Sequence, residues 1–229
     1  MVVKICGMRD PKNIQSLLEL PVDLMGLIFY KKSPRHVPDS AASEILQVSD
    51  GKVKRVGVFV NEDIRIILQK AAKFKLSFVQ LHGKESPDYC YDLLAASAKT
   101  FGCDDELQII KAFSVDEKFD FSITSDYSPY CKYFIFDTKG KNAGGNGFKF
   151  DWSLLDQYTA KTPFLLSGGI GSDAGEAINS LDFPKMIGVD LNSKFEIQPA
   201  LKDVDLLKQF LKTLKQNRDH YVERAENRD

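Results

Sequence analysis

The N-terminal segment carries a cysteine whose position suits acid–base chemistry. The apolar run Val2–Cys6 ends at Cys6, and Lys4 lies two residues earlier. If this run is a strand, Lys4 and Cys6 point to the same face, because side chains alternate along a strand. A nearby ammonium favours the thiolate, so we expect Lys4 to lower the pKa of Cys6. The alternative is a small buried core residue, a common fate of a free cysteine.

A second candidate is the carboxyl of Asp137, which directly follows the apolar residues 133–136. A carboxyl beside a packed apolar interior is partly desolvated. Desolvation raises its pKa and suits it to act as a general acid. The alternative is an ordinary turn or helix-capping residue, since aspartate is frequent at both.

Two further segments could bind the charged ends of a substrate. Gly168 and Gly169 follow an apolar run and precede a predicted helix, where backbone N–H groups can approach an anion. An ordinary tight turn is the alternative there. Arg35 lies in the polar loop 33–36 and could bind a carboxylate with its forked guanidinium. The alternative for Arg35 is a solvated turn.

The composition is that of a globular chain without a nucleic-acid or membrane partner. Of 229 residues, 43% are apolar and 28% charged, and 31 basic against 32 acidic side chains leave a net charge of −1. This balance provides no basic surface for nucleic acid or anionic lipid. No apolar run approaches the roughly 18 residues of a membrane span. The four cysteines form no C-x-x-C pair, so we expect a reduced, cytoplasmic protein without a zinc site.

Short apolar runs alternate with segments of helical periodicity along the chain. Eight runs have the composition of buried strands: 2–6, 24–29, 54–60, 78–81, 107–113, 133–137, 164–167 and 186–190. Seven segments carry apolar residues at helical spacing: 12–20, 39–48, 63–74, 86–98, 151–158, 172–178 and 204–214. Ser86 and Ser172 are predicted N-caps. The polar stretch 115–125 is predicted as a loop or a short helix.

Eight strand–helix repeats predict a single (β/α)8 TIM barrel, an α/β fold with a parallel eight-stranded sheet. An open doubly wound sheet is the alternative. We assign residues 1–216 to the barrel and the charged residues 217–229 to a solvated helix extension or frayed tail. Active sites in such barrels form at the carboxyl ends of the strands, with phosphate often bound after strands seven and eight. Asp190, Asn192 and Ser193 follow the eighth run and add small polar groups beside the glycine loop.

The chain carries a set of short motifs in a fixed order. The motifs are Lys-Ile-Cys-Gly at 4–7, Gly-Leu-Ile-Phe at 26–29, Ser-Pro-Arg at 33–35, Arg-Val-Gly-Val-Phe at 55–59, Gln-Leu-His-Gly at 80–83, Phe-Asp-Thr at 136–138, Gly-Gly at 144–145, Phe-Asp-Trp at 150–152, Leu-Ser-Gly-Gly-Ile at 166–170, Gly-Val-Asp at 188–190 and Lys-Asp at 202–203. Each motif alone is weak, but their order along nearly the whole chain is specific and resembles the phosphoribosylanthranilate isomerases.

The resemblance implies a single barrel that catalyses an Amadori rearrangement in tryptophan biosynthesis without cofactor or metal. The substrate would be N-(5-phosphoribosyl)anthranilate. The resemblance places the general base on Cys6 and the general acid on Asp137, and it assigns the anthranilate carboxylate to Arg35. These roles agree with the chemistry argued from the residues, since the rearrangement needs one acid and one base near neutrality.

The resemblance also implies that the phosphate binds to Gly168, Gly169 and the loop that starts at Asp190. This loop departs from the family pattern, which usually has glycine where this chain has Lys194 and Ala200. The missing glycines remove easy access to a positive φ and put the phosphate contacts of this loop in doubt.

Two other functions remain open on the sequence. The isomerase of histidine biosynthesis catalyses the same rearrangement on a similar barrel, but it has aspartate where this chain has Cys6. A catalytically silent phosphate-binding barrel is the second alternative, and the presence of both Cys6 and Asp137 argues against it. The sequence leaves open whether the chain is a monomer or a homodimer.

Overall fold

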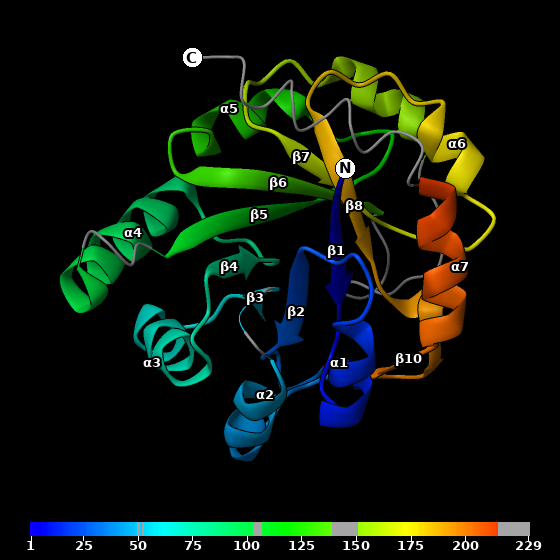
Figure 1. Ribbon diagram of the computed structural model, residues 1–229. Coiled ribbons are helices and arrows are strands. Elements are labelled where there is room, and N and C mark those ends of the chain that lie inside the picture. Colours follow the sequence, from blue (N-terminus) through cyan, green and yellow to red (C-terminus); the bar gives the residue numbers. More distant parts are fainter. Residues whose placement is uncertain (50, 52, 103–106, 139–150, 215–229) are drawn as a thin grey trace.

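The chain folds into a closed barrel of eight parallel strands surrounded by helices (Figure 1). The structure, a computed structural model, describes residues 1–49, 51, 53–102, 107–138 and 151–214. The strands are β1 (Val2–Cys6), β2 (Leu24–Ile28), β3 (Lys54–Phe59), β4 (Phe78–Leu81), β5 (Gln108–Val115), β6 (Cys131–Thr138), β7 (Phe164–Leu166) and β8 (Met186–Leu191). Because β8 pairs with β1, the sheet has no open edge. The predicted barrel is confirmed, and the open doubly wound sheet is excluded.

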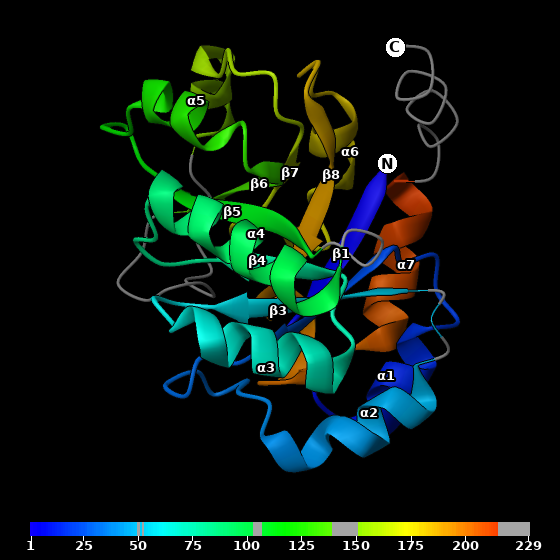
Figure 2. The same ribbon diagram turned by 90° about the vertical axis from the view of Figure 1, so that its left-hand side faces the viewer.

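Helices cover the outside of this barrel, and the view along the side shows α3 and α4 in front of the strands (Figure 2). The helices are α1 (Pro11–Leu17), α2 (Ala42–Val48), α3 (Ile64–Phe74), α4 (Pro87–Phe101), α5 (Thr124–Tyr127), α6 (Gly175–Asn179) and α7 (Val204–Leu214). The described residues also form the 3₁₀ turns η1 (Asp39–Ala41), η2 (Phe121–Ile123), η3 (Trp152–Gln157) and η4 (Ser193–Phe195). No helix within the described ranges is long and apolar enough to cross a membrane.

Two of the predicted helices differ from the structure. The segment 151–158 forms η3, in which the Asp151 side chain accepts from the Ser153 N–H and tightens the turn. The helix expected from Ser172 begins only at Gly175, and its N-cap, Ala174, makes no side-chain bond. Gly175 instead packs closely on Thr213 of α7. Tertiary packing, and not a cap at Ser172, therefore sets the start of α6. The predicted tail 217–229 lies outside the described residues.

The barrel buries apolar side chains on both of its faces. The outer core lies between strands and helices, and a smaller cluster fills the barrel interior. The interior cluster consists of Leu24, Val56, Phe78, Ile110, Ala112, Ile135 and Leu165. Buried polar side chains lie from the middle of the strands to their carboxyl ends, among them Lys4, Gln80, Asp137 and Asp190, together with Ser167 directly after β7. The apolar interior cluster therefore lies beneath a layer of polar side chains at one end of the barrel.

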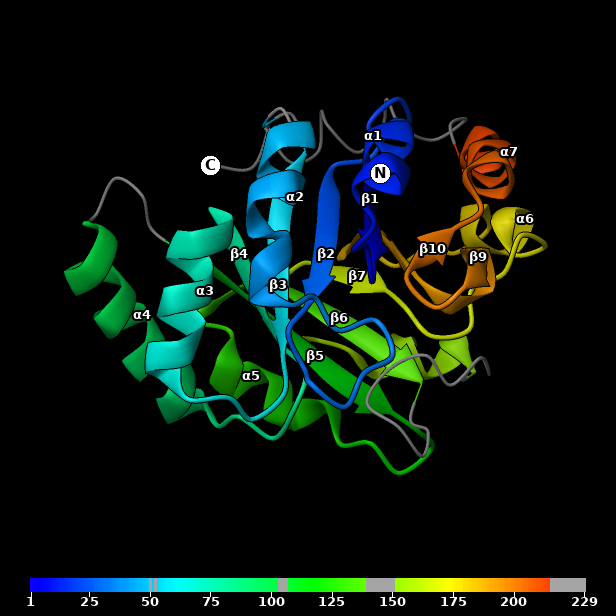
Figure 3. The same ribbon diagram turned by 90° about the horizontal axis from the view of Figure 1, so that it is seen from below.

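A short antiparallel hairpin follows η4, and the sequence analysis did not predict it. Its strands are β9 (Glu196–Gln198) and β10 (Leu201–Lys202), and it lies between β1 and α7 in the view from below (Figure 3). The Asn13 side chain accepts from the Lys202 N–H at 2.8 Å and donates to the Lys202 carbonyl at 2.9 Å. These two bonds attach the hairpin to α1.

The two missing glycines have different consequences. Lys194 does not adopt a positive φ, so its turn needs no glycine. Ala200, at the tip of the hairpin, has a φ of 69°. A Cβ in this left-handed conformation costs roughly 1–2 kcal/mol. The doubt about the loop therefore concerns position 200 and not position 194.

We expect Ala200→Gly to stabilise the protein by roughly 0.5–1 kcal/mol, because it removes the Cβ strain at the cost of a more flexible unfolded chain. Urea unfolding measures this as a higher midpoint with an unchanged slope. The control is Ala72→Gly on the exposed face of α3, which should destabilise by about 1 kcal/mol. An unchanged or lower midpoint for Ala200→Gly would contradict the strain argument.

Candidate active site

The candidate site residues lie on one rim of the barrel, at the carboxyl ends of the strands. Cys6 ends β1, Asp137 is the penultimate residue of β6, and Asp190 lies near the end of β8. Gly168 and Arg35 lie in the segments that follow β7 and β2. Along the order in which strands pair, these groups come from β2, β1, β8, β7 and β6. The fold thus brings together residues that are far apart in the sequence.

The thiol of Cys6 occupies a space that a glycine provides. Cys6 is 4% exposed and lies opposite Gly26 of β2 in the strand register. A Cβ at position 26 would lie 2.8 Å from Cys6 Sγ. A larger residue at position 26 would therefore displace the thiol.

Charged neighbours act on this thiol in opposite directions. Lys4 is fully buried, and its Nζ donates to Asp190 Oδ1 at 2.7 Å. Burial raises the pKa of Cys6, Lys4 lowers it, Asp190 raises it and Lys202 lowers it. Lys4 acts in the expected direction, but burial outweighs it, so the pKa of the thiol lies above its ordinary value. The expectation that the pKa of Cys6 would be lowered overall was wrong, because it left out the desolvation of the buried thiol.

Arg35 holds a carboxylate that the sequence analysis missed. Its Nε lies 2.9 and 3.0 Å from the two carboxylate oxygens of Glu196, and its Nη2 lies 2.5 Å from Oε2. The guanidinium forms the predicted fork, and the carboxylate it binds here belongs to the chain. Among the described residues, none accepts a hydrogen bond from Nη1 of Arg35, so that edge is free for a second carboxylate.

The second cation on Glu196 is Lys202, whose Nζ lies 2.7 Å from Oε1. Burial raises the pKa of Glu196, but the bond to Arg35 and the charge of Lys202 outweigh it and hold this pKa below its ordinary value. Burial lowers the pKa of Lys202 more than Glu196 raises it. The Lys-Asp motif at 202–203 was the only sequence signal for this lysine, and it did not indicate a partner.

Asp137 is buried and has two polar neighbours. Its Oδ1 accepts from the Thr138 N–H at 2.8 Å, and its Oδ2 lies 3.5 Å from Nε2 of His82. The other ring nitrogen of His82 lies 3.0 Å from the amide nitrogen of Gln80. The Thr138 N–H thus orients the carboxyl, and the His82 ring lies beside it, although Nε2 of this ring has no hydrogen-bond partner among the described residues.

The glycine loop passes directly over this carboxyl. Gly168 and Gly169 have φ values of 86° and 65°, a region that favours glycine. A Cβ on Gly168 would clash with Thr138 and lie 2.9 Å from Asp137 Oδ1. The close approach and the positive φ both require glycine at 168.

The segment after β8 is divided between two environments. The Asp190 carboxylate binds Lys4 and accepts from Ser167 Oγ at 3.3 Å, and Asn192 Oδ1 accepts from Lys202 at 2.7 Å. Ser193, at the start of η4, is half-buried. Backbone groups of this segment are therefore better placed to bind an anion than the Asp190 carboxylate, which is already paired.

This arrangement suits proton transfer on a small anionic molecule. A thiol and a carboxyl on one rim can serve as base and acid, and a guanidinium and a glycine loop can hold the ends of a substrate. Within the described ranges, no three histidine, cysteine, aspartate or glutamate side chains gather as a metal site would require.

The sequence matches a protein-family model along most of its length. Residues 3–213 match the model of N-(5′-phosphoribosyl)anthranilate (PRA) isomerase. The N-(5′-phosphoribosyl)anthranilate isomerase of Parabacteroides distasonis is 43% identical over 218 residues, which cover 93% of each chain. That of Phocaeicola vulgatus is 41% identical and covers 94% of this chain and 98% of the relative.

The fold also matches solved structures. The phosphoribosyl anthranilate isomerase of Thermotoga maritima superimposes with a TM-score of 0.77 at 32% identity. The match covers 94% of this chain and 100% of that chain. A phosphoribosyl anthranilate isomerase in complex with reduced 1-(o-carboxyphenylamino)-1-deoxyribulose 5-phosphate gives a TM-score of 0.76 at 31% identity, with 94% of this chain and 100% of that chain covered.

Proposed function

Because the chain belongs to the phosphoribosylanthranilate isomerase family of tryptophan biosynthesis, we propose that it rearranges N-(5-phosphoribosyl)anthranilate by acid–base catalysis between Asp137 and Cys6. The product is 1-(2-carboxyphenylamino)-1-deoxyribulose 5-phosphate. The observation that supports this most is the pair of buried groups, a thiol and a carboxyl, on strands β1 and β6 of one rim.

The reaction begins with two proton transfers. Asp137 donates a proton to the ribose ring oxygen, the C1–O bond breaks, and the anilino nitrogen forms a Schiff base with C1. The Cys6 thiolate then removes the proton from C2, and the electron pair moves to give an enolamine. The enolamine tautomerises to the ketone by losing the proton of the C2 hydroxyl and gaining one at C1. Proton exchange with solvent restores the acid form of Asp137 and the thiolate of Cys6, so the product is an isomer of the substrate. One general acid and one general base with different proton affinities suffice for these steps.

The two anionic ends of the substrate fix its reactive carbons between these groups. The free edge of Arg35 binds the anthranilate carboxylate, while Glu196 holds the opposite edge of the guanidinium. The phosphate binds the backbone of Gly168 and Gly169, together with the loop from Asp190 through Asn192 to Ser193. Held at both ends, the substrate needs little further ordering to react.

Arg35→Ala is expected to raise KM at least about tenfold with a smaller effect on kcat, since it removes a charge-assisted bidentate contact. Steady-state kinetics with substrate generated in the assay measure both constants. The control is Arg65→Ala, which removes an exposed arginine of α3 whose side chain binds Asp63, the N-cap of the same helix. An unchanged KM for Arg35→Ala would exclude Arg35 as the carboxylate anchor.

The activity is tested by assays with two substrates. The purified protein should convert N-(5-phosphoribosyl)anthranilate, and its gene should restore growth without tryptophan to a strain that lacks this isomerase. The same protein is assayed with the phosphoribosyl-formimino intermediate of histidine biosynthesis. Activity on that intermediate alone would favour the sister isomerase, and inactivity on both would favour a phosphate-binding barrel.

A further inference from the structure

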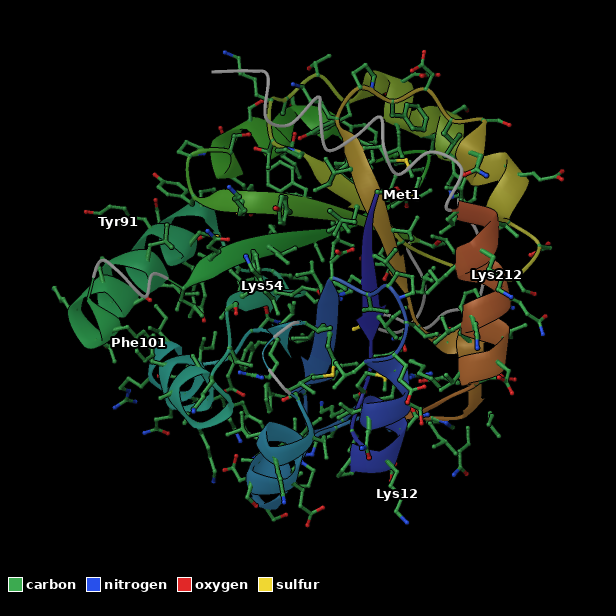
Figure 4. The ribbon with its side chains drawn as sticks, viewed as in Figure 1. Met1, Lys12, Lys54, Tyr91, Phe101 and Lys212 are labelled. Atoms are coloured by element: carbon green, nitrogen blue, oxygen red, sulfur yellow. The ribbon has the colours of Figure 1, made fainter. Side chains whose placement is uncertain are left out.

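A buried lysine outside the proposed acid–base pair lies at the centre of the charged cluster. Lys202 is 1% exposed, whereas Lys12 and Lys212 extend to solvent at the periphery (Figure 4). Its Nζ lies 2.7 Å from Glu196 Oε1 and 2.7 Å from Asn192 Oδ1. A lysine is rarely buried this completely unless its charge is used or paired.

The charge of Lys202 is only partly neutralised. Among the described residues, Glu196 is its one carboxylate partner, and the same carboxylate also binds Arg35 through both of its oxygens. Two cations therefore share one anion. By contrast, Lys4 has the carboxylate of Asp190, on which no second cation lies among the described residues.

Lys202 is linked to the cysteine through the first turn after β1. Gly7, the residue after Cys6, lies close to two side chains of the charged cluster. A Cβ at position 7 would be 2.9 Å from Asn192 Oδ1 and 2.7 Å from Cδ of Arg35. The same Asn192 oxygen accepts a hydrogen bond from Lys202. The register of β1 and β8 pairs Ile5 with Leu191, which brings the residues that follow each of them side by side. Lys202, Asn192 and Arg35 thus lie next to the segment that carries the thiol.

Among the described residues, the network of ion pairs beside the Cys6 segment has an excess of positive charge. Its members are Lys4 on β1, Asp190 on β8, Arg35 after β2, Glu196 on β9 and Lys202 on β10. Three cations against two anions leave one positive charge, which a thiolate at Cys6 would balance.

We propose that Lys202 is a positioning residue that stabilises the Cys6 thiolate, because it and Arg35 share a single carboxylate. The consequence for catalysis rests on the proposed function, in which Cys6 is the base. The direct influence of Lys202 on the thiol agrees with this inference, since Lys202 lowers the pKa of Cys6 against the effect of burial.

The test measures the thiol directly. Cys6 of the full-length protein is alkylated with iodoacetamide at a series of pH values, and the peptide that contains Cys6 is quantified by mass spectrometry. In Lys202→Met, we expect alkylation at pH 7 to be roughly tenfold slower and its pH profile to move to higher pH. Lys202→Arg keeps the charge and should stay close to the wild-type profile.

A second buried lysine provides the matched control. Lys111 on β5 pairs with Glu85 at 3.1 Å and is not among the charges around Cys6. Lys111→Met should therefore lower stability without moving the Cys6 profile. If Lys202→Met does not fold, Lys202→Gln removes the charge while keeping a polar side chain toward Asn192 and leaving Glu196 paired with Arg35. Lys202→Gln also removes the charge that lowers the pKa of Cys6, so we expect the same slower alkylation.

An unchanged Cys6 alkylation profile in a folded Lys202 variant that lacks the charge would overturn the inference, whatever the activity of the enzyme. The pH profile of kcat/KM separates it from the proposed function. If both profiles move together, the lysine acts on the catalytic base. If alkylation slows while the kcat/KM profile stays in place, the inference on the thiolate is supported and the assignment of Cys6 as base fails.

Discussion

Cys6→Ala is expected to lower kcat at least about 100-fold, the usual scale for losing a general base. The substitution removes the group that takes the C2 proton while leaving Arg35 and the glycine loop in place. KM should change little, because Arg35 and the glycine loop, which bind the two charged ends of the substrate, are unaltered. Steady-state kinetics, together with urea unfolding to show that the variant is folded, measure this effect.

Cys131 offers a matched control for this loss of a thiol. It begins β6, at the end of the barrel opposite the candidate site, and it is also buried. Cys131→Ala should cost some stability through lost packing but leave kcat near the wild-type value. Normal turnover by Cys6→Ala would show that another group is the base.

The same assignment fixes the pH dependence of the reaction. Because burial holds the pKa of Cys6 above its ordinary value, the thiol form predominates at neutral pH. Below that pKa, each pH unit raises the thiolate fraction about tenfold, so kcat/KM rises with pH on this limb. In Cys6→Ala this limb should disappear, along with most of the rate.

Asp137→Asn is expected to lower kcat by at least about 100-fold as well, since an amide cannot donate the proton that opens the ribose ring. Asparagine has nearly the same shape and can still accept the Thr138 N–H bond that holds this side chain. Binding of a stable product analogue should therefore be retained. The measurements are kcat and the affinity for the analogue.

Asp182 is the matched control for this carboxyl. It is exposed and precedes β8, at the opposite end of the barrel from Asp137. Asp182→Asn should leave both kcat and analogue binding unchanged. If Asp137→Asn lost analogue affinity as strongly as it lost kcat, the carboxyl would be a binding group and not the acid.

Local patterns in the sequence determined the barrel and the order of its site residues. The mostly apolar run Val2–Cys6 predicted a buried strand, and β1 has the same bounds in the structure. The carboxyl ends of parallel strands meet at one rim, so a list of strand ends already indicated Cys6, Asp137 and Gly168 as neighbours. Strand periodicity and glycine at a sharp turn are local properties, and a single sequence records them.

The tertiary structure alone decided the partners and charges of these groups. Glu196 binds Arg35 from 161 positions away, and Asn13 binds Lys202 from 189 positions away, distances over which no periodicity extends. The pKa of Cys6 depends on how deeply the barrel buries it, and burial proved stronger than the nearby Lys4. The start of α6 at Gly175 follows from packing on α7. Electrostatics and packing act through space, so these features became definite only once the strands had closed into a barrel.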